Sequence, residues 1–123
     1  MIKIVVGTLR GRIIKTPSGD KTRPSSSKVR ESIFNIIQNK LEGSIWLDLF
    51  AGTGAIGIEA ISRGAKKVTF VEKDYNAFKN LKENINSLKI TEQAILTKFD
   101  SINFLLECSN SFDFIFIDPP YLS

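Results

Sequence analysis

From Ser44 onward, short apolar runs alternate with stretches of helical periodicity, in units of about 25–30 residues. Strands and helices that alternate in this way predict an α/β fold, a parallel sheet with helices on both faces. The expected strands are Ile45–Phe50, Lys67–Glu72, Ala94–Thr97 and Phe112–Ile117, and the expected helices are Ala55–Arg63, Tyr75–Leu88 and Ile102–Glu107, the last capped by Ser101.

The residues before Ser44 follow a different pattern. They predict two extended pieces (Ile2–Val6 and Arg12–Ile14), a polar loop (Thr16–Ser27) and a helix whose apolar, core-facing residues are Val29, Ile33, Ile36 and Ile37. We therefore divide the chain into a basic N-terminal extension, residues 1–43, and an α/β domain, residues 44–123.

A glycine-rich turn joins the first expected strand of the domain to its first helix. Gly52, Gly54 and Gly57 match G-x-G-x-x-G in the strand–turn–helix context that this motif requires. Glu72 ends the next strand, where a carboxylate can accept hydrogen bonds from both hydroxyls of a ribose. These features predict a site for a nucleoside-containing cofactor. The expected cofactor-binding residues are Asp48, Phe50, Ala51, Gly52, Thr53, Gly54, Glu72, Lys73, Asp100 and Ser101.

Asp48 and Asp100 indicate which cofactor this is. A carboxylate directly before the loop would repel the pyrophosphate of a dinucleotide, whereas S-adenosylmethionine presents an ammonium group and a sulfonium cation. Asp48 therefore favours S-adenosylmethionine over NAD. Asp100 follows the third strand, where a carboxylate can accept from the adenine amino group, although capping of the next helix explains Asp100 nearly as well.

The tetrapeptide Asp118-Pro119-Pro120-Tyr121 follows the fourth strand directly. The Asp118 carboxylate and the Pro119 carbonyl are two fixed acceptors for the hydrogens of an exocyclic amino group, which they would orient for attack on a sulfonium methyl. Tyr121 offers a stacking face for a base. We therefore expect Asp118, Pro119, Pro120 and Tyr121 to be the catalytic residues.

The positive charge is concentrated in the N-terminal part. Residues 1–47 hold nine Lys and Arg against three Asp and Glu, whereas residues 48–123 hold eight against ten. This asymmetry indicates a surface that faces a polyanion, although a solvated basic surface explains it equally well. The expected RNA-binding residues are Arg10, Arg12, Lys15, Arg23, Lys28 and Arg30; Arg23 is alternatively placed to bind the cofactor carboxylate or to brace the helix.

Together, the glycine loop and the tetrapeptide resemble S-adenosylmethionine-dependent methyltransferases that act on exocyclic amino groups of nucleic acids. Thr22-Arg23-Pro24 and Val29-Arg30-Glu31-Ser32 further resemble the bacterial family that methylates guanine N2 in small-subunit (16S) ribosomal RNA. The resemblance implies a Rossmann-like methyltransferase fold, ribosomal RNA as substrate, alone or within an assembling subunit, and further C-terminal strands that this chain lacks.

The missing strands would leave one edge of the strand Phe112–Ile117 bare, so we expect weak turnover and self-association through that edge. Three alternatives remain: a DNA adenine-N6 methyltransferase, a fragment that binds cofactor or RNA without turnover, and an NAD-dependent oxidoreductase, which Asp48 opposes. A single cysteine, Cys108, and no histidine exclude a metal site of the usual zinc ligands and Ser-His-Asp catalysis. No segment predicts a membrane span or a signal peptide, so we expect a cytoplasmic protein.

Overall fold

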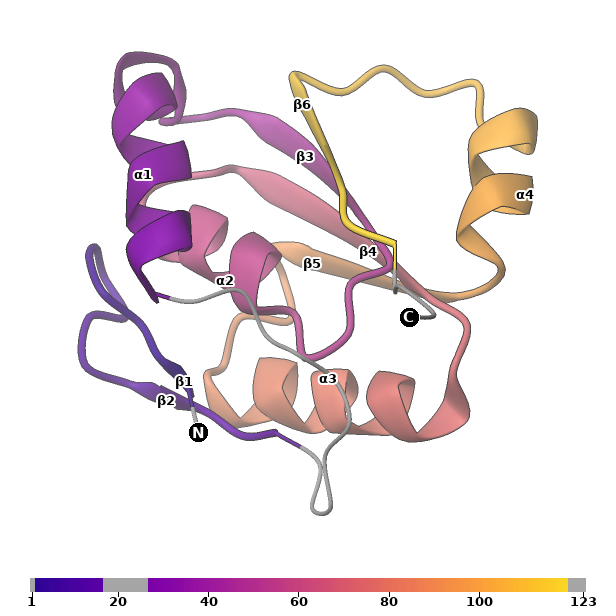
Figure 1. Ribbon diagram of the computed structural model, residues 1–123, viewed down its shortest axis with the longest axis horizontal. Coiled ribbons are helices and arrows are strands. Elements are labelled where there is room, and N and C mark those ends of the chain that lie inside the picture. Colours follow the sequence, from indigo (N-terminus) through magenta and orange to yellow (C-terminus); the bar gives the residue numbers. More distant parts are fainter. Residues whose placement is uncertain (1, 17–26, 120–123) are drawn as a thin grey trace.

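The computed structural model describes residues 2–16 and 27–119 and is built on a four-stranded parallel sheet (Figure 1). Strand β3 (Ile45–Leu49) pairs with β4 (Lys67–Glu72) on one side and with β6 (Phe114–Ile117) on the other. Strand β5 (Ala94–Lys98) pairs with β4, which gives the order β5-β4-β3-β6. The predicted α/β fold with a parallel sheet is confirmed.

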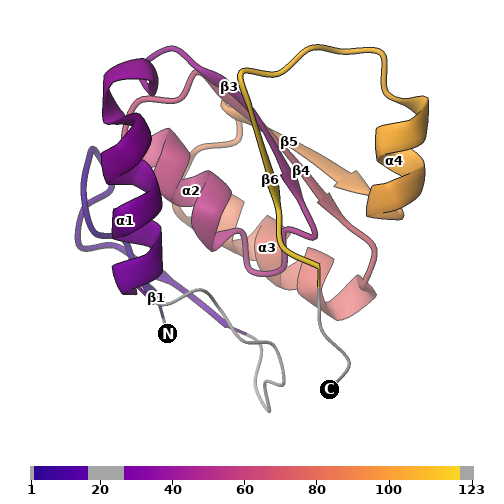
Figure 2. The same ribbon diagram turned by 45° about the horizontal axis from the view of Figure 1, so that its top comes forward.

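Helices cover both faces of the sheet, but unequally (Figure 2). Helices α1 (Ser27–Ile37), α2 (Ala55–Ser62) and α3 (Tyr75–Ser87) pack on one face, where they share a large apolar cluster with the strands. The other face carries α4 (Ser101–Glu107) and a small cluster of Leu47, Leu49 and Val71. Every residue of α2 is buried, because this helix lies between the sheet and the N-terminal extension.

The N-terminal extension packs against α2. Strands β1 (Ile2–Lys3) and β2 (Ile13–Ile14) form an antiparallel ribbon whose buried isoleucines join the large cluster. The backbone N–H groups of Val5 and Val6 both donate to the Glu59 carboxylate of α2, at 3.1 Å each. The extension therefore shares its apolar core with the helix that follows the glycine loop.

Helix α1 shows a different buried face from the predicted one. Phe34 is fully buried and packs on the Trp46 ring at a centroid distance of 5.5 Å. Val29 and Ile36, which we expected in the core, are 50% and 83% exposed. Because successive helical residues are 100° apart, burying Phe34 turns these two side chains toward solvent. The 3₁₀ turn η1 (Gln38–Lys40) continues the helix.

The structure also bears on the expected cap of α4 and on the expected bare edge of β6. Asp100, not Ser101, caps α4, since its carboxylate accepts from the Asn103 N–H at 2.9 Å. On the sparsely covered face of the sheet, Ile115 and Ile117 of β6 are about half exposed. Strand β6 pairs only with β3 among the described strands, which agrees with the predicted bare edge. No helix in residues 2–16 and 27–119 is long and apolar enough to cross a bilayer.

Candidate cofactor and base site

The candidate site lies at the edge of the sheet where all four parallel strands end. Leu49 pairs with Val71 and with Ile117, and Glu72 pairs with Lys98. The segments that follow these residues, namely the glycine loop, the loop after β4, Phe99-Asp100 and Asp118-Pro119, therefore lie beside one another (Figure 1). The fold thus brings the segments predicted to bind the cofactor next to the segment predicted to bind the base.

The glycine loop has the tight left-handed turns that its sequence predicts. The φ angles are 56° at Phe50, 58° at Gly52 and 86° at Gly54. The Gly54 N–H donates to the Ala51 carbonyl at 2.8 Å, which closes the turn. A Cβ at Gly54 would lie 2.4 Å from Leu81 Cδ1 of α3, so a larger residue would displace Leu81 and also strain the backbone at its positive φ. The space beside Gly52 is open, since its nearest neighbour would be the Phe50 carbonyl oxygen at 4.0 Å.

Glu72 joins the end of β4 to this loop. One carboxylate oxygen accepts from the Gly52 N–H at 2.8 Å, and the other accepts from the Asp74 N–H at 2.9 Å. An ionised carboxylate has about four acceptor sites, so both oxygens retain capacity for further donors. Glu72 is only partly buried and lies next to the open space at Gly52. These residues fit a ligand that carries a pair of hydroxyl groups.

Asp48 lies beneath the loop. Its side chain is 2% exposed, and Oδ2 accepts from the Gly57 N–H at 3.2 Å in the first turn of α2. Burial raises the pKa of Asp48 well above its ordinary value; the Gly57 hydrogen bond opposes this shift, and the carboxylates of Glu72 and Asp118 add to it. Asp48 therefore links the end of β3 to the first turn of α2. Its expected contact with an ammonium group stays a prediction.

Three further predicted residues lie around the start of α4. Asp100 caps this helix, and Lys73 Nζ lies 3.9 Å from its other carboxylate oxygen. The buried Ser101 hydroxyl accepts from the Phe50 N–H at 3.0 Å, so it supports the glycine loop directly. The same hydrogen bond fixes α4 to the beginning of that loop.

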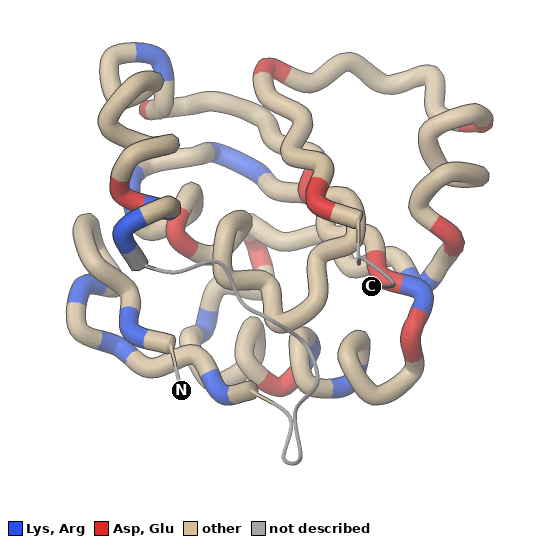
Figure 3. Tube along the Cα trace, viewed as in Figure 1, with Lys and Arg blue, Asp and Glu red and all other residues tan. Residues whose placement is uncertain are grey.

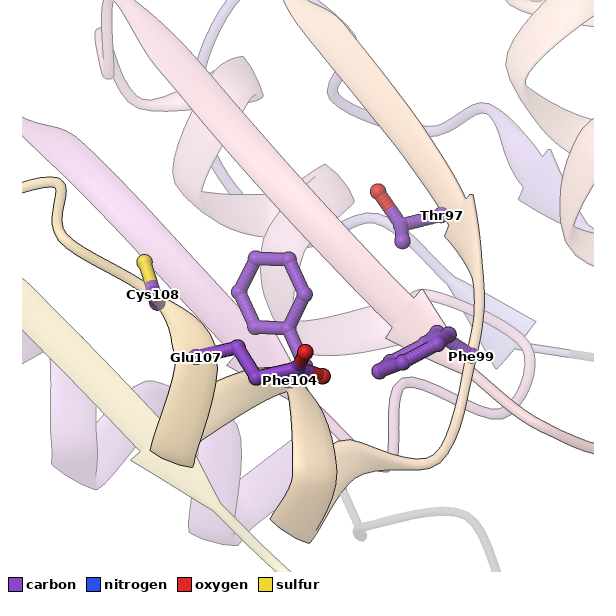
Figure 4. A pocket seen from close by; sticks show the side chains of 5 residues that line it. All are labelled: Thr97, Phe99, Phe104, Glu107 and Cys108. Atoms are coloured by element: carbon purple, nitrogen blue, oxygen red, sulfur yellow. The ribbon is translucent and has the colours of Figure 1, made fainter.

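A small pocket opens between β5 and α4 (Figure 4). It has a volume of about 280 Å³ and is lined by Thr97, Phe99, Phe104, Glu107 and Cys108. Phe99 directly precedes Asp100, and its ring is 41% exposed. Phe99 and Phe104 are the aromatic residues of this pocket, and Phe99 is next in sequence to the predicted adenine-binding Asp100.

Asp118 and Pro119 are exposed beyond the end of β6. The Asp118 carboxylate contributes to the raised pKa of Asp48, so the two carboxylates lie within electrostatic range of each other. Pro120, Tyr121 and Arg23 lie outside the described residues, so their predicted roles stay predictions.

Four of the predicted RNA-binding residues, Arg10, Arg12, Lys15 and Lys28, are exposed, on the N-terminal ribbon and at the start of α1 (Figure 3). Arg12 also donates to the Ser87 carbonyl at 3.2 Å, at the end of α3.

The prediction that Arg30 binds RNA is wrong. Its side chain is 2% exposed and donates to the Lys3 carbonyl at 3.1 Å, and burial lowers its pKa. Arg30 therefore holds β1 to α1 and is not available to a phosphate.

Sequence reasoning missed two buried polar residues, Asn84 and Glu59. Asn84 on α3 bonds both to Lys15 and to Thr53 of the glycine loop, whereas Glu59 on α2 binds the N-terminal extension and Arg63. Asn84 precedes Ile85 and Glu59 follows Ile58, and such a position alone gives no signal, because polar residues beside an apolar stripe are usually solvated. Only the docking of the extension over both helices makes them buried.

Comparisons with known proteins agree with this geometry. The family described as "Conserved hypothetical protein 95" matches residues 2–123. Ribosomal RNA small subunit methyltransferase D of Haemophilus influenzae is 40% identical over 123 residues, which cover 98% of this chain and 64% of that protein. The Bacillus subtilis protein YlbH is 39% identical, with 98% of this chain and 67% of that protein covered.

A solved Escherichia coli structure superposes with a TM-score of 0.86 at 35% identity, covering 98% of this chain and 64% of that one. The chain thus spans about two thirds of the length of these relatives. A match over nearly every residue, together with the shared fold, shows that the chain belongs to the family described as Conserved hypothetical protein 95, together with the proteins named ribosomal RNA small subunit methyltransferase D.

Proposed function

We propose that this chain carries the cofactor and target-base site of an S-adenosylmethionine-dependent methyltransferase that acts on the exocyclic N2 amine of a guanine in small-subunit ribosomal RNA. The main supporting observation is the pair of hydrogen bonds by which Glu72 faces the open glycine loop, at the same sheet edge as Asp118. The names of its relatives support ribosomal RNA as the substrate.

S-adenosylmethionine supplies a methyl group activated by its sulfonium centre. Glu72 holds the ribose hydroxyls with its remaining acceptor capacity, and the partly exposed Phe99 and the Asp100 carboxylate contact the adenine. The negative charge of Glu72, Asp100 and Asp118 around this edge suits a cationic cofactor better than a pyrophosphate. A NAD-dependent reaction is correspondingly disfavoured.

At the target base, the Asp118 carboxylate and the Pro119 carbonyl accept the two hydrogens of the amine and aim its nitrogen at the methyl group. As the new carbon–nitrogen bond forms, the bond between the methyl group and the sulfonium sulfur would break and leave S-adenosylhomocysteine. The amine would lose one proton, for which the Asp118 carboxylate is the proposed acceptor. Tyr121 stacks on the base. The exposed cations Arg10, Arg12, Lys15 and Lys28 contact phosphates, which orient the RNA without reading its sequence.

Cofactor binding is tested first, because it depends on residues that this chain contains. Calorimetric titration should show binding of S-adenosylhomocysteine and none of NAD. Binding of NAD in preference to S-adenosylhomocysteine would overturn the proposal.

Methyl transfer is then measured with tritiated S-adenosylmethionine on small-subunit ribosomal RNA and on duplex DNA. The assay uses this chain and a chimera that continues after Tyr121 with the C-terminal segment of the Haemophilus influenzae relative. We expect labelled N2-methylguanosine from the RNA and no label in DNA, and we expect the chimera to turn over faster. N6-methyladenine in the DNA would instead establish the alternative DNA methyltransferase.

Asp118→Ala should abolish transfer in the chimera and change the affinity for S-adenosylhomocysteine by less than about twofold, since Asp118 is proposed to touch the target amine alone. Glu83→Ala, an exposed substitution on α3, is the matched control and should leave both quantities unchanged.

A further inference from the structure

Asn84 is the one residue of α3 through which two distant segments meet among the described residues. Its Oδ1 accepts from the Lys15 N–H at 2.9 Å, and its Nδ2 donates to the Lys15 carbonyl at 2.9 Å. The same Nδ2 lies 3.3 Å from the Thr53 carbonyl of the glycine loop. Lys15 is 69 residues and Thr53 is 31 residues from Asn84 in the chain.

The side chain is 2% exposed, so these contacts are shielded from water. Binding both the N–H and the C=O of one residue reproduces the pairing of two β-strands, and it fixes the direction of the backbone at Lys15. Removing such a buried amide leaves polar backbone groups of the glycine loop and of the N-terminal segment unsatisfied at once. Asn84 is therefore a shared support for both segments.

Neighbouring contacts also join α3 to both segments. Leu81, one turn before Asn84, packs under Gly54 so closely that a Cβ at Gly54 would lie 2.4 Å from it. One turn after Asn84, the Ser87 carbonyl accepts from the Arg12 guanidinium at 3.2 Å. Both ribbon views show β2 and the segment after it running beside α3 (Figures 1 and 2). We call residues 10–16, which carry Arg10, Arg12 and Lys15, the basic arm.

We propose that Asn84 is a positioning residue that couples the glycine loop to the basic arm, so that occupancy of the loop by cofactor orders the arm for RNA. The proposal rests on the proposed function in naming the cofactor and the RNA. Coupling of this kind is reciprocal: a cofactor that fixes Thr53 strengthens the arm's attachment to Asn84, and a detached arm weakens the cofactor's binding by the same factor.

The first test measures hydrogen exchange at the backbone N–H of Lys15, with and without S-adenosylhomocysteine. In the unaltered protein, the ligand should slow this exchange by about five- to tenfold, the effect of about one additional hydrogen bond's stability. Asn84→Asp keeps the acceptor for the Lys15 N–H but loses the Nδ2 donor to the Lys15 and Thr53 carbonyls, so the ligand should have no effect on that exchange. Asn86→Ala, exposed on the same helix, is the control and should retain the full effect.

The second test is a double-mutant cycle on the affinity for S-adenosylhomocysteine, read by calorimetry. Lys15→Pro removes the N–H that donates to Asn84 and should weaken binding about fivefold. Lys15→Ala keeps that N–H and should leave the affinity unchanged. In the Asn84→Asp background, Lys15→Pro should cost nothing further, because the connection is already broken. Circular dichroism of each variant checks that it is folded.

The outcomes separate this inference from the proposed function. If S-adenosylhomocysteine does not bind the unaltered chain, the proposed function fails. If it binds, yet leaves the Lys15 exchange unchanged, the coupling is refuted while the function stands. Additive effects of Lys15→Pro and Asn84→Asp would also refute it. Should Asn84→Asp not fold, the contrast between Lys15→Pro and Lys15→Ala still decides the matter.

Discussion

The Glu72 carboxylate and the Gly52 N–H are joined by a hydrogen bond of 2.8 Å across 20 residues of sequence. The bond connects the end of β4 to the turn that precedes α2, and Glu72 also accepts from the Asp74 N–H at the start of α3. One side chain therefore sets the relative position of two loops that both face the proposed cofactor.

Glu72→Ala should weaken the binding of S-adenosylhomocysteine by about tenfold or more, since it removes an ionised acceptor and frees the Gly52 turn. Calorimetric titration measures this loss. Glu83→Ala, which removes an exposed carboxylate from α3, is the control. An unchanged affinity in Glu72→Ala would exclude Glu72 from the cofactor site.

Asp48→Asn should raise the melting temperature at neutral pH when no ligand is present. Burial raises the pKa of Asp48 above its ordinary value of 3.8, so the fold favours the neutral carboxyl. Its contribution to stability is therefore complete below the unfolded pKa and is lost as the pH rises through the folded pKa. Asparagine stays neutral and still offers an acceptor to the Gly57 N–H. The difference between variant and parent should shrink as the pH falls toward 3.8, and a difference that grows in acid would contradict this account.

Gly57→Ala should destabilise the protein by about 1–3 kcal/mol through overpacking. The added Cβ would lie 2.2 Å from Phe70 Cε1 and 2.9 Å from Val68 Cγ1. Guanidinium unfolding measures the change in the free energy of unfolding. In a Phe70→Leu background, which removes the ring, the cost of Gly57→Ala should fall; an equal cost in both backgrounds would show that the close approach is not its cause.

RNA affinity should fall linearly with salt on logarithmic axes, because the exposed cations of the N-terminal ribbon displace counterions from phosphates. Arg10→Ala should reduce the magnitude of the slope of log affinity against log salt concentration by roughly 0.7–0.9, the contribution of one phosphate contact. Lys66→Ala, exposed just before β4 at the opposite edge of the sheet from the candidate site, should leave the slope unchanged. Fluorescence anisotropy with a small-subunit ribosomal RNA transcript provides the measurement, and equal slopes for all three proteins would remove the ribbon from the RNA interface.

Self-association through β6 should appear as a mass that rises with protein concentration in light scattering. The edge of β6 that no other described strand pairs with, together with the half-exposed Ile115 and Ile117, favours pairing with a second copy. Replacing both isoleucines by lysine should keep the protein at the monomer mass. Ile36→Lys, which changes an exposed isoleucine on α1, should leave the self-association unchanged. A parent chain that stays monomeric at every concentration would contradict this prediction.

The sequence by itself determined the order of strands and helices and the edge at which the candidate site lies. The strand β4 has the predicted bounds, and the other main strands and helices differ by a residue or two at their ends. These features are local: apolar periodicity selects strand or helix, and glycines at Gly52 and Gly54 supply backbone angles that other residues rarely adopt. Parallel pairing then brings the strand ends together without further information.

Tertiary structure alone decided which polar groups are buried and what they hold. Arg30 reads as one more cation of a basic segment, yet packing of Phe34 on Trp46 turns it inward to Lys3. Asn84 reads as one more polar residue of an amphipathic helix, yet the N-terminal extension covers it and makes it a support for the glycine loop. Burial of a side chain depends on which segment, distant in the chain, packs over it. Local periodicity does not identify that segment.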